Sequence, residues 1–144
     1  MPKRADFHRC AGTLLRQASR VATNHFDSSL AKTGLRLSQL TILMTLRSAG
    51  SKNINELADI LILDRTTLGR NLRPLQRDRY LTIRPGNEDR RARELVLTRK
   101  GEATVLRAID EWGDAQTNFE KRIGPKNAIA LSKLLRQVVR SAAP

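Results

Sequence analysis

Arginine is concentrated between residues 64 and 93, so this stretch holds the side chains that are best suited to bind another molecule. This stretch holds nine arginines and four acidic residues, which gives it a net charge of about +5. A guanidinium group is planar and donates paired hydrogen bonds that match phosphate oxygens and the edge of guanine. Arginines at this density predict binding to a phosphate-rich polyanion.

A helix is predicted to position the first five of these arginines. The segment LDRTTLGRNLRPLQRDRY repeats leucine at helical intervals, so one side of the helix is apolar and the other is cationic. The cationic side carries Arg65, Arg70, Arg73, Arg77 and Arg79. Pro74 lies inside the segment, but Leu75 continues the apolar side, so we expect the helix to extend to about Arg79. For Arg77 and Arg79, a solvated helix face without a partner is an equally good interpretation.

A basic hairpin is predicted directly after this helix. Residues 81–84 and 94–98 alternate apolar and polar side chains, and a Pro-Gly-Asn turn lies between them. We expect the carboxylate of Asp89 to hold the side chain of Arg91 in a fixed rotamer. The tip arginine that enters a narrow minor groove is then Arg90 or Arg91. A cationic helix followed by an arginine hairpin is typical of a winged helix-turn-helix.

Helices are also predicted before the arginine-rich stretch. Residues 6–32 form one long helix with a stop at Gly34, and Ser38 caps a second helix. Asn55 caps a short third helix, and Asp64 caps the arginine helix. A short helix, a tight turn and a cationic helix follow one another in the order of a helix-turn-helix.

After the hairpin, Thr98 is expected to cap a helix that runs to about Arg122. Gly124 and Pro125 then stop this helix and start the last one. One side of the helix that Thr98 caps is expected to carry Ala103, Leu106, Ile109 or Asp110, Gly113 and Thr117. The predicted fold is therefore mainly α (α+β), a winged helix-turn-helix between N- and C-terminal helices.

The 144 residues are long enough for one domain with a single core. We expect the winged helix-turn-helix at 35–98, a linking helix at 99–121, and dimerisation helices at 1–34 and 122–144. Packing the terminal helices together within one chain leaves apolar surface uncovered, and a two-fold homodimer covers it. Such a dimer places two recognition helices about 34 Å apart, the spacing of adjacent major grooves on one face of DNA.

The whole chain has 27 Lys and Arg and 14 Asp and Glu, for a formal charge of +13. Binding of such a chain to phosphates releases condensed counterions and favours a nucleic-acid partner. No apolar run is long enough to cross a membrane and no secretion signal opens the chain, so we expect a cytoplasmic protein without a membrane partner. One cysteine and two histidines exclude an internal disulfide and a structural zinc site, and no cofactor is predicted.

Two other classes of function compete with DNA binding. A basic RNA-binding or ribosome-associated protein has similar charge and size, but aromatic residues for stacking bases are only 3% of the chain. An enzyme is disfavoured because the sequence shows no paired carboxylates, Cys-His couple or glycine-rich phosphate loop. The sequence therefore favours a protein that binds double-stranded DNA and is not an enzyme.

Over about residues 7–140, the sequence resembles the MarR family of bacterial winged helix-turn-helix regulators. The most specific element is the hairpin NEDRRARELVLTRKG, which carries the family's pattern at Asp89, Arg91, Leu97, Thr98 and Gly101. The resemblance implies a homodimer that represses transcription on a palindromic operator. It also implies release by a small aromatic or phenolic anion, or by oxidation of a cysteine.

Residues near the start of the arginine helix are the predicted base readers. Thr66, Thr67 and Arg70 lie on its first turns and are expected to reach base edges, with Arg70 on guanine as the strongest contact. Arg65 and Arg73 are expected to contact phosphate. The alternative for Thr66 and Thr67 is that they only start the helix.

A ligand pocket and a redox site are the remaining hypotheses. His25, Phe26 and Trp112 are candidates to line a pocket between the dimerisation helices and the DNA-binding lobe, although aromatic residues at helical spacing more often belong to a core. Cys10 lies near the position of the reactive cysteine in the peroxide-sensing branch of the family. That branch surrounds its thiol with tyrosines, and this chain has one, Tyr80, so a core Cys10 is favoured over a sensor.

Overall fold

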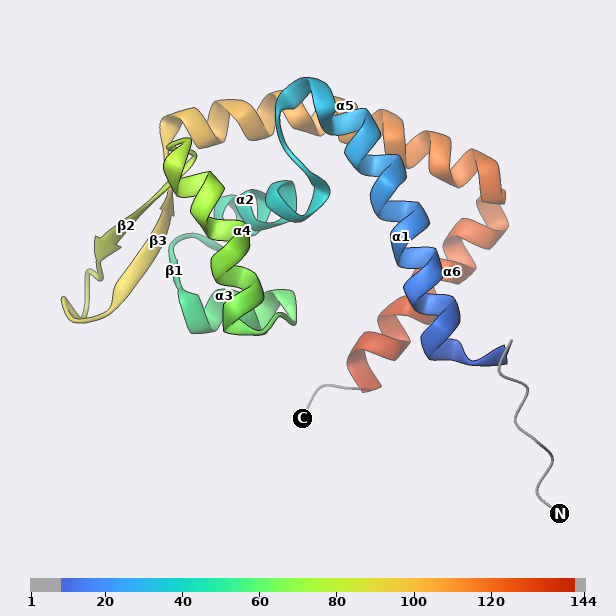
Figure 1. Ribbon diagram of the computed structural model, residues 1–144, viewed down its shortest axis with the longest axis horizontal. Coiled ribbons are helices and arrows are strands. Elements are labelled where there is room, and N and C mark those ends of the chain that lie inside the picture. The colour runs from blue at the N-terminus through green and yellow to red at the C-terminus, as the bar shows by residue number, and fades with distance from the viewer. Residues whose placement is uncertain (1–8, 142–144) are drawn as a thin grey trace, which may run out of the picture.

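The computed structural model describes residues 9–141, which form an arch of two lobes (Figure 1). The elements are α1 (Ala11–Leu30), a short 3-10 helix (Ala31–Thr33), α2 (Leu37–Ala49), β1 (Lys52–Asn53), α3 (Ile54–Leu61), α4 (Arg65–Arg77), β2 (Leu81–Pro85), β3 (Arg93–Leu97), α5 (Arg99–Ile123) and α6 (Pro125–Ser141). Helices α2 to α4 and the strands make one lobe, α1 and α6 make the other, and α5 runs across the top of both. The predicted mainly α fold with a small sheet is confirmed.

Two predicted helix caps are confirmed. The Asp64 carboxylate accepts from the amide of Thr67 at 2.8 Å at the start of α4. The Thr98 hydroxyl accepts from the amide of Gly101 at 3.0 Å at the start of α5. In both cases a side-chain oxygen satisfies an amide that has no partner within the helix.

Two other predicted caps are wrong. Helix α2 begins at Leu37, before Ser38, because the Asp27 carboxylate of α1 accepts from the amide of Leu37 at 2.7 Å. Helix α3 is capped by Asn53 and not by Asn55, since the Asn53 side chain and Glu56 satisfy each other's amides at 2.9 and 2.8 Å.

Helix α4 continues through Pro74 to Arg77, two residues short of the predicted end. Arg79 follows in the left-handed region at φ 61°, and the chain turns there into the sheet. The sheet has the order β1-β3-β2 and is antiparallel throughout, with Leu81 opposite Leu97 and Lys52 opposite Leu95. Strand β1 was not predicted. Two residues are too short for a periodic pattern to show, and only pairing with β3 makes them a strand.

The main core lies in the lobe of α2 to α4 and under the first half of α5. The core is formed by leucines of α2, α3 and α4 together with Leu30, Leu81, Leu95, Val105 and Ala108. The side of α5 predicted from the sequence is not the side that faces the core, because Thr104, Val105 and Ala108 are fully buried while Leu106 is 50% exposed. Helix α5 has apolar residues on several sides, and the position of α2 selects the side that is buried.

The terminal lobe exposes apolar side chains on α1 and α6. Leu14, Val21, Leu134 and Val138 are between 48% and 66% exposed. Residues of α1, the end of α5 and α6 line an apolar groove of about 830 Å³ between these helices. A continuous exposed apolar surface along three helices is typical of an interaction site. Within the described residues, no helix is long and apolar enough to cross a membrane.

Candidate nucleic-acid interface

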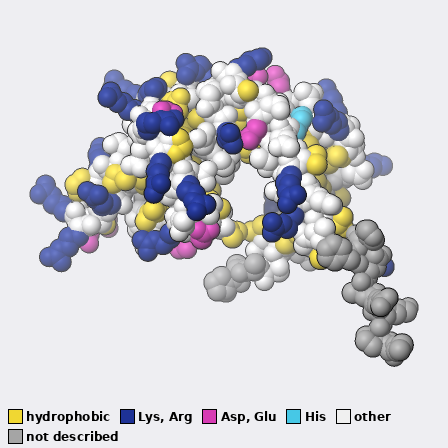
Figure 2. Space-filling view, in the orientation of Figure 1, with side chains coloured by type: hydrophobic (Ala, Val, Ile, Leu, Met, Phe, Trp, Pro, Cys, Tyr) yellow, Lys and Arg dark blue, Asp and Glu magenta, His cyan; other side chains and the backbone are white. Residues whose placement is uncertain are grey.

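Helix α4 separates its leucines from its arginines. Leu68, Leu72 and Leu75 are at most 4% exposed and hold the helix on the core. The opposite face is exposed and carries Arg65, Thr66, Arg70, Arg73 and Arg77. Figure 2 shows Lys and Arg side chains gathered over this lobe and its hairpin. Apolar anchoring on one side thus presents guanidinium groups to solvent on the other.

The structure distinguishes between Thr66 and Thr67. The Thr67 hydroxyl donates to the second carboxylate oxygen of Asp64 at 2.6 Å, in addition to the bond from its amide. These two bonds, from the hydroxyl first and the amide second, lower the pKa of Asp64. Thr67 therefore completes the helix cap, and its donor proton is occupied, whereas Thr66 is exposed and has no such bond among the described residues.

A second polar contact ties α4 to α2. The Asn71 side chain donates to the Thr67 carbonyl at 3.0 Å and accepts from the Ser38 hydroxyl at 3.1 Å. Ser38 and its neighbour Arg36 are exposed at the start of α2, beside α4. Sequence reasoning did not include these two residues among the DNA contacts, because Ser38 was expected to act only as a cap.

The tip of the hairpin is organised by Asp89, but not in the predicted way. The Asp89 carboxylate accepts from the backbone amide of Arg91 at 2.9 Å, and the described residues show no ion pair between the two side chains. The carbonyl of Asp89 accepts from the amide of Ala92 at 3.0 Å, and the carbonyl of Ala92 accepts from the amide of Gly86 at 2.8 Å. Asp89 therefore fixes the backbone of the turn and not the rotamer of Arg91.

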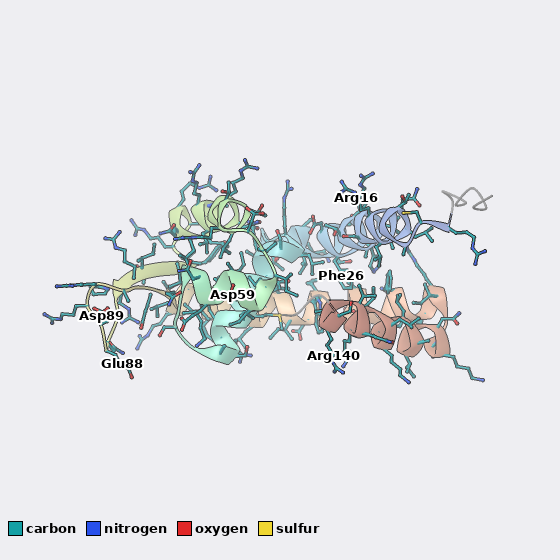
Figure 3. The ribbon with its side chains drawn as sticks, turned by 90° about the horizontal axis from the view of Figure 1, so that it is seen from below. Arg16, Phe26, Asp59, Glu88, Asp89 and Arg140 are labelled. Carbon is teal, nitrogen blue, oxygen red and sulfur yellow. The ribbon has the colours of Figure 1, made fainter. Side chains whose placement is uncertain are left out.

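The guanidinium groups of the hairpin remain available for a partner. Arg90 and Arg91 are exposed, and neither forms an ion pair within the described part of the chain. Seen from below, Glu88 and Asp89 mark the outermost point of the hairpin (Figure 3). Arg84 and Arg93 are also exposed, on β2 and β3. They were counted in the charge of the stretch but were not assigned a contact, although their place beside the turn was readable from the sequence.

A close-packed corner locks the hairpin onto α4. The Thr98 hydroxyl contacts the carbonyls of Arg79 and Tyr80 at 2.7 and 3.1 Å, and the Lys100 ammonium donates to the Asp78 carbonyl at 2.7 Å. A Cβ atom at Gly101 would overlap the Tyr80 carbonyl oxygen. The Thr-x-x-Gly spacing of the hairpin motif therefore serves to set the hairpin at a fixed position relative to α4.

The three candidate ligand-binding residues do not form one cluster. His25 donates from Nε2 to the carbonyl oxygen of Ala115 at 2.8 Å, and its ring meets Phe26 edge-on and Phe119 at a tilt, at 5.4 and 5.9 Å between centroids. Phe26 also lines the apolar groove between α1 and α6. Trp112 packs instead against the main core. The structure therefore brings His25 and Phe26 together and leaves Trp112 apart.

Cys10 lies directly before α1 and is exposed. Hydrogen bonds from the backbone and then the side chain of Thr13 lower the pKa of its thiol. The prediction that Cys10 belongs to the core is wrong for the single chain, because Cys10 is exposed and α1 begins only at Ala11; residues 6–8 of the predicted helix lie outside the described residues. A redox role for Cys10 stays a prediction.

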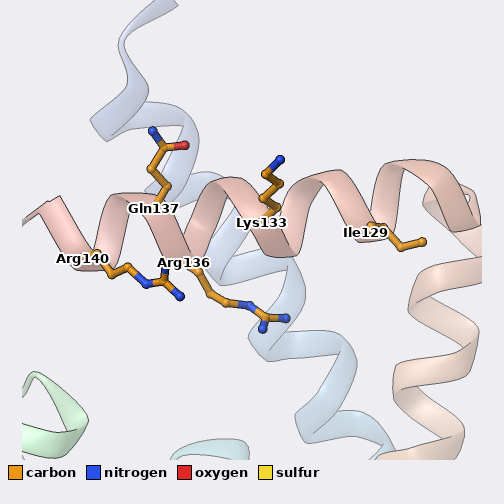
Figure 4. Close-up of a pocket in the computed structure, with 5 residues that line it drawn as sticks. All are labelled: Ile129, Lys133, Arg136, Gln137 and Arg140. Carbon is orange, nitrogen blue, oxygen red and sulfur yellow. The ribbon is translucent and has the colours of Figure 1, made fainter.

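Helix α6 carries a second basic surface, far from the hairpin. Ile129, Lys133, Arg136, Gln137 and Arg140 line a shallow groove of about 440 Å³ on its solvent side (Figure 4). Residues 125–144 include four basic and no acidic side chains. In Figure 3, Asp89 lies near one end of the molecule, and Arg140 lies nearer the middle, at the C-terminal end of α6. Cationic charge is therefore present both at and away from the α4 surface.

The arrangement of α3, α4 and the β2–β3 hairpin defines a winged helix-turn-helix. Residues 35–92 match the model of the MarR family. The match covers this part of the chain and agrees with the family resemblance seen in the sequence. No curated protein matches the sequence.

Several solved structures share the fold of the whole chain. BpsR from Bordetella bronchiseptica, whose DNA binding is regulated by 6-hydroxynicotinic acid, is 23% identical, with a TM-score of 0.84 over 96% of this chain and 97% of BpsR. The repressor CouR, bound to a 23-mer DNA duplex, is 24% identical, with a TM-score of 0.84 over 96% of this chain and 99% of CouR. A mutant of MarR from E. coli complexed with operator DNA is 23% identical, with a TM-score of 0.80 over 88% of this chain and 91% of that one.

Proposed function

We propose that the protein is a homodimeric transcriptional repressor that binds a palindromic operator in double-stranded DNA. The observation that carries the proposal is the exposed face of α4, with Arg65, Thr66, Arg70 and Arg73, held beside a hairpin whose arginines form no ion pair with any residue from 9 to 141. An α-helix such as α4 fits into a major groove of DNA, and the hairpin arginines suit the negative potential of a narrow minor groove. Arg70 reads a base edge, while Arg65 and Arg73 contact phosphate.

DNA is favoured over RNA as the partner. A-form RNA has a deep and narrow major groove that side chains do not read, and sequence-specific RNA binding uses exposed aromatic residues. The only tyrosine, Tyr80, packs against the core, and Trp112 does so as well. The family match and the similar structures give the RNA-binding alternative no support.

The apolar groove between α1 and α6 supports a two-fold dimer. The groove is lined by Leu14, Leu15, Phe119, Leu134 and Val138, among others. A second copy offers the same apolar helices, so each chain covers the groove of the other. The dimer then carries two copies of α4 related by a two-fold axis, which matches the symmetry of a palindromic site.

Release by a small aromatic ligand is part of the proposal. His25, Phe26 and Phe119 provide aromatic surface where α1 meets α5, the helix that joins the two lobes. A ligand that binds there changes the contact between the lobes, and this in turn changes the distance between the two α4 helices of the dimer. We place this activity in the cytoplasm, where the operator is accessible.

Two measurements test DNA binding. Selection from a pool of random duplexes should enrich a palindrome with half-sites centred about one helical turn apart. Affinity for that duplex should fall roughly a thousandfold or more when salt rises from about 50 to 200 mM, for a dimer with six to ten phosphate contacts. Absence of any enriched sequence, or a flat dependence on salt, would contradict the proposal.

The dimer is tested by a pair of substitutions on α6. Leu134 is 59% exposed and lines the apolar groove, whereas Ile129 is 73% exposed and lies on the basic side of the helix. Leu134→Glu should yield a monomer in light scattering, because a charge is then buried in the dimer interface. Ile129→Glu should leave the dimer intact. Equal behaviour of the two variants would show that the groove is not the interface.

A further inference from the structure

Helix α4 contains a half-buried glycine beside the exposed arginines of the proposed DNA-binding face. Gly69 lies one helical turn after Arg65 and one turn before Arg73, so these three residues form one ridge of the helix. Thr66 and Arg70 flank the same position and are exposed. Gly69 itself is half-buried, and the space that a side chain would fill at this position is open.

Nothing within the folded chain requires a glycine at this position. Gly69 is not among the residues with positive φ, and a Cβ atom built there would meet no atom within 4 Å. By contrast, Gly101 cannot carry a Cβ without overlap with Tyr80. Glycine in a helix interior lowers the folding equilibrium constant roughly fivefold relative to alanine. The chain thus accepts a loss of stability that its own packing does not explain.

Gly113 has no internal reason either, but Gly69 differs because exposed arginines surround it, and close approach of another molecule is a reason for a missing side chain at such a position. A major groove is about 12 Å wide, and a helix with its side chains is about 10–12 Å across, so the fit leaves little space. A Cβ on the contact side holds the helix away by about the length of one carbon–carbon bond, roughly 1.5 Å. That distance is enough to break a hydrogen bond between an arginine and a base edge.

We propose that Gly69 is a specificity-determining position, where the bare backbone of α4 lies against DNA and lets Arg70 reach the base edges. The inference rests on the proposed function and adds a residue to it. Arg65 and Arg73 extend on either side of Gly69 toward phosphate, and their reach is less affected by a small displacement because their side chains are long and flexible. Loss of Gly69 should therefore reduce sequence-specific affinity more than nonspecific affinity.

The test compares two helix-interior glycines. Gly113 lies in α5, has no positive φ, and a Cβ there would also meet no atom within 4 Å. Gly69→Ala and Gly113→Ala should each raise the melting temperature by a few degrees, because alanine is the better helix former. Only Gly69→Ala should weaken binding to the selected duplex, by about tenfold or more, with less than a threefold change on an unrelated duplex.

The outcomes separate the inference from the function on which it rests. If the parent protein selects a duplex and Gly69→Ala binds that duplex as tightly, Gly69 is not a contact position and the inference is overturned, while the proposed function stands. An equal loss of affinity on selected and unrelated duplexes also overturns it. If the parent protein selects no duplex, the proposed function fails and the inference fails with it.

Discussion

The turn at the tip of the hairpin allows two effects of Asp89 on DNA binding to be separated. Asp89→Ala removes both the negative charge and the hydrogen bond to the amide of Arg91, which spans 2.9 Å. Asp89→Asn removes the charge alone, because the amide oxygen of asparagine still accepts from that backbone amide. Loss of the negative charge predicts tighter DNA binding for both variants. Loss of the hydrogen bond that orders the turn predicts weaker binding for Asp89→Ala only.

The magnitudes decide which effect is larger. A carboxylate about 10 Å from a phosphate is repelled in water by about 0.4 kcal/mol, and screening at physiological ionic strength reduces this to about 0.1 kcal/mol. A hydrogen bond that orders the turn contributes about 0.5–1.5 kcal/mol, or roughly two- to tenfold in affinity for each hairpin that contacts DNA. A dimer that uses two hairpins should therefore lose roughly fourfold to a hundredfold with Asp89→Ala. Asp89→Asn should bind as tightly as the parent protein or slightly more tightly.

Fluorescence anisotropy with a labelled duplex at about 150 mM salt measures both affinities at a screening length near 8 Å. Thermal unfolding of each variant shows whether the rest of the fold is unchanged. Equal affinities for Asp89→Ala and Asp89→Asn would show that the hydrogen bond to Arg91 does not organise the wing. Tighter binding by Asp89→Ala would show that Asp89 is only a repulsive surface charge.

Three further predictions concern α4 and its surroundings. Arg70→Ala should cost about 1–3 kcal/mol of DNA affinity and relax the preference at one or two operator positions, while Arg140→Ala, the same change of charge on α6, should alter affinity less than twofold in anisotropy titrations. Gly101→Ala should lower the free energy of unfolding by about 3 kcal/mol or more in urea, since its Cβ overlaps backbone at the start of β2. The hydroxyl and amide of Thr67 lower the pKa of Asp64, so its ionised form stabilises the fold above the ordinary Asp pKa and this contribution is lost as pH falls through the lowered pKa. The difference in melting temperature between the parent and Asp64→Asn should therefore change between pH 6 and pH 3, and a constant difference would contradict this.

Most local signals were read correctly from the sequence, and signals that depend on distant segments were not. Asp64 and Thr98 were identified as caps because a cap and its amide lie within three residues. The sequence analysis named Asn55 as the cap of α3 and missed the capping box of Asn53 and Glu56, although these two residues also lie within three positions of each other. The start of α2 depends on Asp27, ten residues away on another helix.

The candidate site shows the same division. Exposure of the α4 arginines follows from leucine spacing, so these residues were identified from the sequence. The role of Asp89 was assigned to the wrong atoms of Arg91, because a carboxylate two residues before an arginine can accept from its backbone as well as from its side chain. The separation of Trp112 from His25 depends on how α1 crosses α5, which no periodic pattern specifies.

Helix α5 acts as a lever arm. Its 25 residues span about 37 Å. The corner where Thr98 and Gly101 pack against Tyr80 lies at one end, and the apolar groove lies at the other. A rotation of about 10° around the groove end moves the corner end by about 6 Å, a distance comparable to the step between neighbouring phosphates and well beyond the reach of a hydrogen bond. For the proposed operator binding we therefore expect an angular tolerance of only a few degrees, set by side chains of α1 and α6, outside the α4 and hairpin surface. Substitutions in the terminal lobe should consequently change which half-site spacing the protein accepts, while the bases that it reads stay the same.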